Sequence, residues 1–101
     1  MKKKIDSEKD VERTLVNLIK VNNGLCIKLL CDQCIGLPDR LCLLPNGKIA
    51  FVELKTTGQK PRPIQEFKIN QLRSLGFYVA VIDTIDGALN FVTDFLLHEL
   101  Q

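Results

Sequence analysis

Three charged side chains stand where the chain changes from apolar to polar: Asp39, Glu53 and Lys55. Residues 49–52 are all apolar, and they predict a central strand that is buried on both faces. Glu53 and Lys55 follow two positions apart, so they should project from one face of that strand, roughly 6.5–7 Å apart. A carboxylate and an ammonium in this position suit chemistry on a charged substrate. For an isolated Glu-x-Lys, a strand that simply emerges into solvent there is the favoured interpretation.

The partner strand begins at Asp39, and the loop between the two strands decides what Asp39 faces. A two-residue loop of Asn46 and Gly47 would place it on the wrong face. A three-residue loop, 45–47, places Asp39 directly opposite Glu53, with Gly47 in the left-handed position that such loops favour. We predict the second register. Two carboxylates that close repel each other unless a proton or a metal lies between them, and oxygen ligands favour Mg²⁺ or Mn²⁺ over Zn²⁺.

An acidic residue also interrupts the apolar stripe of the first predicted helix. At about 100° per residue, Glu12 falls within an arc of apolar side chains, namely Val11, Leu15, Val16, Leu18 and Ile19. A carboxylate on such a stripe is unfavourable unless it is paired or binds a cation. Two interpretations of Glu12 stay open: a member of a site, or a residue at the edge of the arc whose carboxylate reaches water.

The elements that must position these residues can be predicted from periodicity and turn signals. Ser7 or Asp6 can cap a helix that runs to about Asn22. We predict strands at 25–30, 40–44, 49–55 and 77–82, and further helices at 64–75 and 86–100. The helix between the last two strands makes a crossover, which should leave those strands parallel. The order αβββαβα indicates an α/β domain with a mixed sheet flanked by helices.

Length and composition fit one globular domain over residues 1–101. Apolar residues make up 46% of the chain and charged residues 26%, and no apolar stretch approaches the roughly 20 residues of a membrane span. Lys2–Lys4 are followed by polar residues where a signal peptide would be apolar, so we expect a cytoplasmic protein. The net charge of +2 is weak support for nucleic-acid binding.

Four cysteines raise the question of metal or redox chemistry. The C-x-x-C spacing of Cys31 and Cys34 invites a zinc or redox interpretation, but a zinc site needs two further ligands in range. Cys26 and Cys42 are available by number, yet both lie in apolar strand patterns. We therefore predict reduced cysteines that serve as buried structural thiols.

Taken together, the motifs resemble the PD-(D/E)XK nuclease superfamily, and most closely its virus-type replication-repair nuclease (VRR-NUC) domain in a stand-alone viral or bacterial form. The resemblance covers nearly the whole chain. It includes the helix with Glu12, the segment Gly36-x-Pro38-Asp39-Arg40, the strand Phe51-Val52-Glu53-Leu54-Lys55-Thr56, and Pro63-Ile64-Gln65 at the start of the next helix. The core order of helix, three strands, helix and strand agrees, which implies a restriction-endonuclease-like fold.

The resemblance assigns roles to these residues. It implies that Asp39, Glu53 and the Leu54 carbonyl hold Mg²⁺ or Mn²⁺ and that Lys55 orients or activates water. It also implies that Glu12 completes the site, with or without a bridging water, and that Gln65 lies near the scissile phosphate or holds the site together. Lys60 and Arg62, in the loop after the catalytic strand, are candidate contacts to the DNA backbone, and Lys28 and Arg40 are weaker ones.

The substrate and the assembly are the finer expectations. The last predicted helix is apolar over a wide arc of Ala88, Phe91, Val92, Phe95, Leu96 and Leu100, which suggests more apolar surface than one small core covers. The resemblance extends to dimeric junction resolvases, so we predict a homodimer that cleaves branched DNA such as four-way (Holliday) junctions. The alternatives are cleavage of flap, nicked or linear DNA, a non-cleaving DNA-binding module, and a protein-interaction module.

Overall fold

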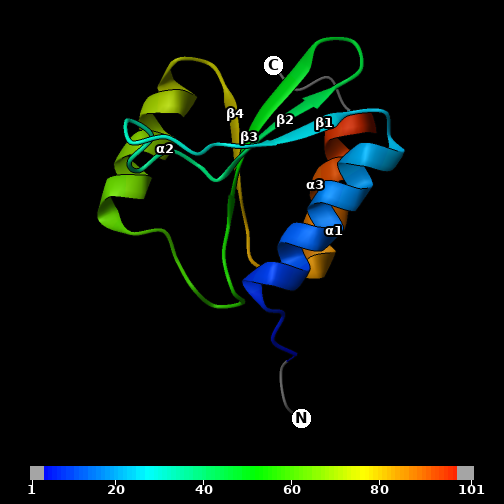
Figure 1. The fold of residues 1–101 in the computed structure, drawn as a ribbon, viewed down its shortest axis with the longest axis horizontal. Helices are drawn as coiled ribbons and strands as arrows, with labels where there is room; N and C mark the ends of the chain where they lie inside the picture. Colours follow the sequence, from blue (N-terminus) through cyan, green and yellow to red (C-terminus); the bar gives the residue numbers. More distant parts are fainter. Residues whose placement is uncertain (1–3, 98–101) are drawn as a thin grey trace.

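The structure, a computed structural model, describes residues 4–97 as three helices and four strands (Figure 1). The elements in chain order are α1 (Glu8–Val21), β1 (Leu25–Lys28), β2 (Arg40–Leu44), β3 (Lys48–Leu54), α2 (Pro63–Ser74), β4 (Tyr78–Ile82) and α3 (Ile85–Leu97). This order confirms the predicted αβββαβα, although β1 ends two residues earlier than predicted. The predicted helix end at Leu100 lies outside the described residues. No helix in the described part of the chain is long and apolar enough to cross a membrane.

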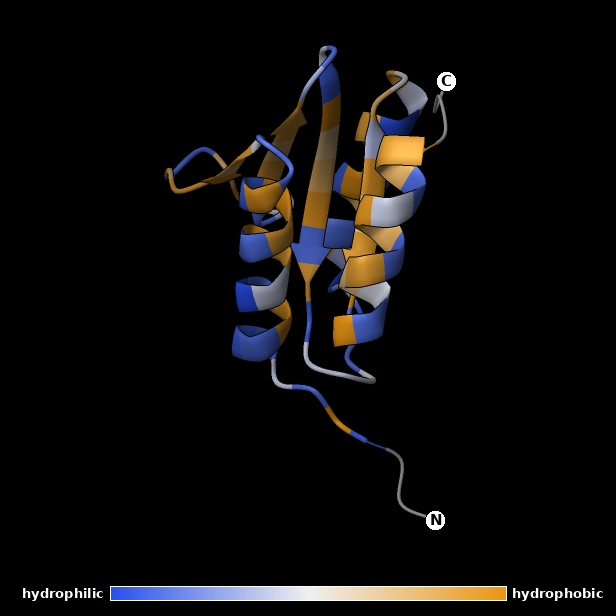
Figure 2. Cartoon of the chain, turned by 90° about the vertical axis from the view of Figure 1, so that its right-hand side faces the viewer, coloured by the Kyte–Doolittle hydropathy of each residue, from blue (hydrophilic) through white to orange (hydrophobic). Residues whose placement is uncertain are grey.

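The four strands form one mixed sheet in the order β1-β2-β3-β4. β1 pairs antiparallel with β2, and β2 with β3, whereas β4 runs parallel to β3, as expected for strands joined by a crossover helix. Figure 1 shows the sheet between α2 on one side and α1 with α3 on the other, and Figure 2 shows α1 and α3 side by side in front of the sheet. The predicted α/β architecture is therefore confirmed.

The register of the β2–β3 hairpin follows from its three-residue loop. Leu44 pairs with Lys48 and Arg40 pairs with Val52, so residues 45–47 form the loop and the odd-length alternative was the right one. Asn46 has φ 70° and Gly47 has φ 72°, two left-handed positions that Asn and Gly tolerate better than other residues. One step beyond Arg40, the same register sets Asp39 opposite Glu53.

Ile69 of α2 and Val79 of β4 are buried on the α2 face of the sheet, but the main hydrophobic core lies on the other face. Side chains from β2, β3 and β4 meet α1 and α3 there, and the fully buried members include Val11, Leu15, Ile19, Cys42, Ala50, Val52 and Ala88. On the opposite face Ile49 is 44% exposed, so the prediction that β3 is buried on both faces was wrong for its first half. The reason is that α2 covers only the part of that face near β4.

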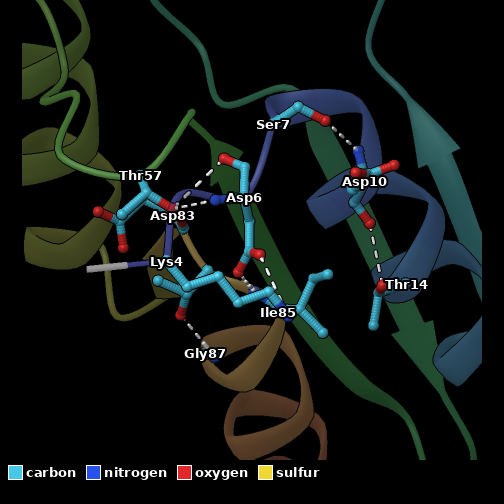
Figure 3. A network of polar contacts seen from close by, with 10 residues as sticks. Lys4, Asp6, Ser7, Asp10, Thr14, Thr57, Asp83, Ile85 and Gly87 are labelled. Carbon is cyan, nitrogen blue, oxygen red and sulfur yellow. Dashed lines mark hydrogen bonds and ion pairs between the residues drawn. The ribbon is translucent and has the colours of Figure 1, made fainter. Parts of the chain in front are cut away.

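The start of α1 is tied to two distant segments (Figure 3). Ser7 is the N-cap, because its Oγ accepts a hydrogen bond from the Asp10 N–H at 3.1 Å. Asp6, the other predicted cap, instead accepts the Ile85 N–H, the first of α3, at 2.8 Å, while Thr84 is the N-cap of α3 and accepts the Gly87 N–H at 2.8 Å. The Asp6 N–H donates to Thr57 Oγ1 at 2.9 Å, which links the same residue to the loop that follows β3.

The prediction that all four cysteines are reduced was wrong for two of them. Cys31 and Cys34 form a disulfide, because the turn between them brings their Cα atoms to 5.2 Å, within the range that a disulfide spans. Cys42 is a buried thiol and Cys26 a half-buried one, as predicted. Their sulfur atoms lie 3.9 Å apart on paired strands, without a bond.

Removal of the Asp6 carboxylate should destabilise the fold. D6A leaves the Ile85 N–H at the start of α3 without its carboxylate partner, and we expect a loss of about 1–2 kcal/mol in the free energy of unfolding. Urea denaturation followed by circular dichroism measures this loss. The matched control is D94A, which removes an exposed aspartate from the same helix. Equal stability of D6A and D94A would contradict the assignment of Asp6 as the partner of the Ile85 N–H.

Candidate active site

Glu53 is the centre of the polar cluster on the α2 side of the sheet. It is only 1% exposed, although it carries a carboxylate. Its Oε2 lies 3.1 Å from Lys55 Nζ and accepts a hydrogen bond of 2.8 Å from Gln65 Nε2. The alternation along β3 therefore places Glu53 and Lys55 on one face, as predicted from their spacing.

Gln65 joins the strand to the helix that follows. It lies in the first turn of α2, which begins at Pro63, a residue well suited to the first position of a helix. Its Oε1 accepts hydrogen bonds from Lys55 Nζ at 2.9 Å and from the Arg62 N–H at 2.8 Å. The side-chain amide of Gln65 thus accepts a backbone N–H at the start of α2 through Oε1 and donates to Glu53 through Nε2. The structure brings Gln65 into the cluster that the sequence predicted.

Asp39 reaches the cluster from the residue just before β2. Its Oδ2 accepts the Leu54 N–H at 2.9 Å, and its own carbonyl accepts the Leu29 N–H at 2.9 Å. The preceding Pro38 is fully buried. These contacts hold Asp39 beside the end of β3, so the structure gathers Asp39, Glu53, Lys55 and Gln65 at one place.

The surroundings of Glu53 raise the pKa of its carboxyl group. Burial raises the pKa of the Glu53 carboxyl above its ordinary value, and the nearby negative charge of Asp39 raises it further, against the opposing effect of Lys55. Glu53 Oε1 is buried and has no hydrogen-bond partner within the described residues. An unpartnered buried oxygen is unfavourable in a protein, and it is the kind of atom that a cation would satisfy.

Glu12 and Arg40 lie on the other face of the sheet. Arg40 pairs with Val52, on the core face, and its Nη2 donates to Glu12 Oε2 at 2.9 Å. The Glu12 side chain is 31% exposed and that of Arg40 is 13% exposed. This ion pair accounts for the carboxylate on the apolar stripe of α1. Across residues 4–97, no group of three or more His, Cys, Asp or Glu side chains is arranged to hold a metal ion.

The remaining basic candidates differ in their exposure. Lys60 and Arg62 are exposed in the loop between β3 and α2, and Lys28 is exposed at the end of β1. Arg40, in contrast, also donates to the Cys26 carbonyl and is largely covered. The network of Asp6 and Thr57 behind the loop was not predicted. The one sequence feature that pointed to this network is the pair Asp6 and Ser7, because either residue could cap a helix and only one is needed for α1.

A carboxylate pair and a lysine at adjoining strand ends of a mixed sheet define the class of PD-(D/E)XK nucleases. Residues 5–84 match the VRR-NUC domain, and a solved structure of a VRR-NUC domain superposes with a TM-score of 0.79. That structure is 28% identical and the match covers 87% of this chain and 97% of that one. A protein of Acyrthosiphon pisum secondary endosymbiont phage 1, named "Putative nuclease p44", is 42% identical over 79 residues, 78% of this chain and 85% of its own length. The chain belongs to the VRR-NUC family of nucleases.

The raised pKa of Glu53 makes a testable prediction about stability. A carboxyl whose pKa is higher in the folded state than in the unfolded state contributes most at low pH, and that contribution is lost as pH rises through the folded-state pKa. The stability of E53Q minus that of the wild type should therefore increase as pH rises above about 4, the ordinary pKa range of a glutamate. Urea denaturation at each pH measures this difference. The baseline is E66Q, which removes an exposed carboxylate from the same turn of α2 as Gln65. A difference that stays constant or shrinks as pH rises would refute the electrostatic description of Glu53.

Proposed function

We propose that this nuclease is a divalent-metal-dependent endonuclease that hydrolyses phosphodiester bonds in DNA. The observation that carries the proposal is the buried, unpartnered Oε1 of Glu53, which lies in a cluster with Asp39 and Lys55. Two neighbouring carboxylates repel each other, and a bound cation would relieve that repulsion. The ammonium group beside them could bind a phosphate. The phage relative, which carries the name of a nuclease, supports this proposal.

The donor set fits a hard divalent cation. Asp39, Glu53 and the backbone carbonyl of Leu54 would hold it, and oxygen donors of this kind favour Mg²⁺ or Mn²⁺. When bound, the cation supplies charge to the phosphate and lowers the pKa of water. Glu12 stays a predicted fourth member, acting with or without a bridging water, although its carboxylate is paired with Arg40 on the core side.

Lys55 is the residue best placed to act on the reacting groups. Two of its three ammonium protons can be accounted for by Glu53 and Gln65, which leaves one to hold water or a phosphate oxygen. In the hydrolysis a water oxygen bonds to phosphorus while one P–O ester bond breaks, which leaves a phosphate monoester and a hydroxyl group. Gln65 keeps the ammonium beside Glu53 during this step, so it is a positioning residue in this proposal.

The DNA backbone would be held by the exposed basic residues near the cluster. Lys60 and Arg62 project from the loop between β3 and α2, next to Gln65, and Lys28 lies at the end of β1. Contacts to phosphate by such residues set position and salt dependence and carry no sequence preference. Arg40, which is largely covered by its ion pair, is the weakest of the proposed contacts.

For the substrate we retain branched DNA, four-way junctions above all, cleaved by a homodimer. The apolar arc of the last helix does not support the dimer, because Ala88, Phe91, Val92 and Phe95 are buried in the core. The support comes instead from the open part of the sheet, where Leu25 is 64%, Ile27 40% and Ile49 44% exposed. An apolar sheet face of this kind is suited to a second copy of the chain. The phage relative is consistent with action in the cytoplasm of a bacterial cell.

Removal of the proposed catalytic groups should abolish cleavage without unfolding the protein. We expect D39N, E53Q and K55A each to lower the cleavage rate of labelled DNA at least about 100-fold in Mn²⁺, and EDTA to abolish it. E12Q tests the predicted membership of Glu12 in the same assay. The control is K20A, which removes an exposed lysine from the last turn of α1. Cleavage by K55A at the wild-type rate, or no cleavage of any DNA by the wild type, would refute the proposal.

The branched substrate and the dimer can be tested together. We expect the wild type to sediment as a dimer and to cut a four-way junction in two paired strands faster than a linear duplex. I27D places a charge on the open sheet face and should give monomers and lose the paired cuts. L89D, at a residue 49% exposed on α3, is the control and should remain a dimer. A wild-type monomer at high micromolar concentration, or flap, nicked or linear DNA cut as fast as the junction, would remove this part of the proposal.

A further inference from the structure

The outer side of α2 carries apolar residues that the core does not use. Phe67 is 63% exposed and Ile64 is 44% exposed, three positions apart and hence neighbours on one side of the helix. Ile35, in the loop between β1 and β2, is 69% exposed. We call Ile35, Ile64 and Phe67 the outer apolar patch.

The loop that contains Ile35 lies against the first turns of α2. A Cβ built on Gly36 would lie 2.9 Å from Ile64 Cγ1 and 3.0 Å from Lys68 Cγ, and Gly36 has φ +81°. Only glycine allows so close an approach with that backbone conformation. In Figure 1 this loop crosses α2. Both elements of the patch are therefore brought to one region of the surface.

The outer apolar patch is adjacent in sequence to a residue of the candidate active site. Ile64 immediately precedes Gln65, whose amide holds both Glu53 and Lys55. On a helix the two side chains point about 100° apart, so Gln65 faces the sheet while Ile64 faces outward. DNA whose scissile phosphate lies at Glu53 would therefore bring its neighbouring nucleotides over the outer apolar patch.

Positive charge surrounds the patch. Lys60 and Arg62 are exposed just before α2, and Lys68 lies beside Ile64 next to Gly36. Around the helix, the exposed Glu66 points about 160° away from Ile64 and about 100° away from Phe67. Asp32 is an acidic residue of the facing loop. An exposed aromatic ring bordered by basic side chains is the combination with which proteins bind single-stranded nucleic acid, through stacking on bases and contacts to phosphates.

We propose that Phe67, supported by Ile64 and Ile35, is a stacking platform for an unpaired base of the DNA substrate. This inference rests on the proposed nuclease function and adds a physical source of selectivity to it. In a continuous duplex every base is stacked between its neighbours and is not available to the ring. At a fork or a flap an unpaired base is exposed, and stacking on Phe67 stabilises its complex with the enzyme while the phosphate lies at Glu53.

The test compares binding of two DNA probes to the full chain in EDTA, where no cleavage interferes. One probe is a fork with 2-aminopurine in its unpaired arm, and the other is a fully paired duplex with the same base. We expect F67A to weaken fork binding at least about five-fold and to change duplex binding less than about two-fold. The matched control is L75A, which removes a 68% exposed leucine about 12 Å further along α2 and should alter neither affinity.

A second variant gives a direct signature of stacking. The chain contains no tryptophan, so F67W introduces a single indole at the platform. We expect F67W to retain fork binding, and its fluorescence to be quenched by the fork and not by the duplex. Equal losses of fork and duplex affinity in F67A, or no loss in either, would overturn the platform. So would sedimentation showing that F67A converts a dimer to a monomer, because the patch would then be an interface between copies.

The platform and the nuclease proposal can fail separately. Cleavage of the plain duplex in Mn²⁺ is measured for the wild type and F67A alongside the binding assays. Absence of cleavage of every DNA tried, the four-way junction and the fork included, would overturn the proposed function, whereas fork-selective binding in EDTA would still support the platform. Duplex cleavage at equal rates by both proteins, with fork binding unchanged in F67A, would overturn the platform and leave the nuclease function intact.

Discussion

A carboxylate that is 1% exposed must be compensated, and the arrangement of this protein around Glu53 follows from that requirement. Lys55 supplies the charge and Gln65 supplies a hydrogen bond, and both act on the same oxygen. The second oxygen is left without a partner among the described residues. The fold therefore provides partners for Oε2 and leaves Oε1 to the cation that we propose. The unfavourable burial of Glu53 is in this way coupled to function.

The two faces of the sheet divide the work of stability and chemistry. Cys42, Ala50 and Val52 face α1 and α3 and form the core, while Glu53 and Asp39 face the side of α2. The hairpin register makes this division, because a slip by one residue would turn Asp39 toward the core and an apolar neighbour toward the site. The three-residue loop at 45–47 is thus as necessary to the site as the residues that bear the charges.

α2 connects the chemistry to the surface on which DNA would lie. Its inner side delivers Gln65 to Glu53, and its outer side leaves Ile64 and Phe67 exposed. A short helix that covers only part of a sheet contributes less apolar burial than α1 or α3. It leaves the apolar part of the sheet near β1 exposed, and we assign this surface to a second copy of the chain. It also leaves the region around Phe67 exposed, and we assign that region to the DNA substrate.

Much of the site could be predicted from the sequence because it depends on local geometry. Strand alternation sets Glu53 and Lys55 on one face, and the odd-length loop sets Asp39 opposite Glu53, whatever else surrounds them. Helix periodicity also identified Glu12 as a residue that needed a partner. These inferences require only chain connectivity and fixed repeat lengths, which a sequence contains in full.

Other features required the tertiary structure, since they depend on which distant segments meet. Glu12 pairs with Arg40, 28 residues away, and Asp6 accepts the first N–H of α3 from 79 residues away, and neither partner is marked by spacing. The incomplete cover over β3, which leaves Ile49 exposed, depends on where α2 lies. The sequence alone determined which residues could do chemistry, and long-range packing decided what each of them contacts, because contacts between distant segments are set by the whole fold.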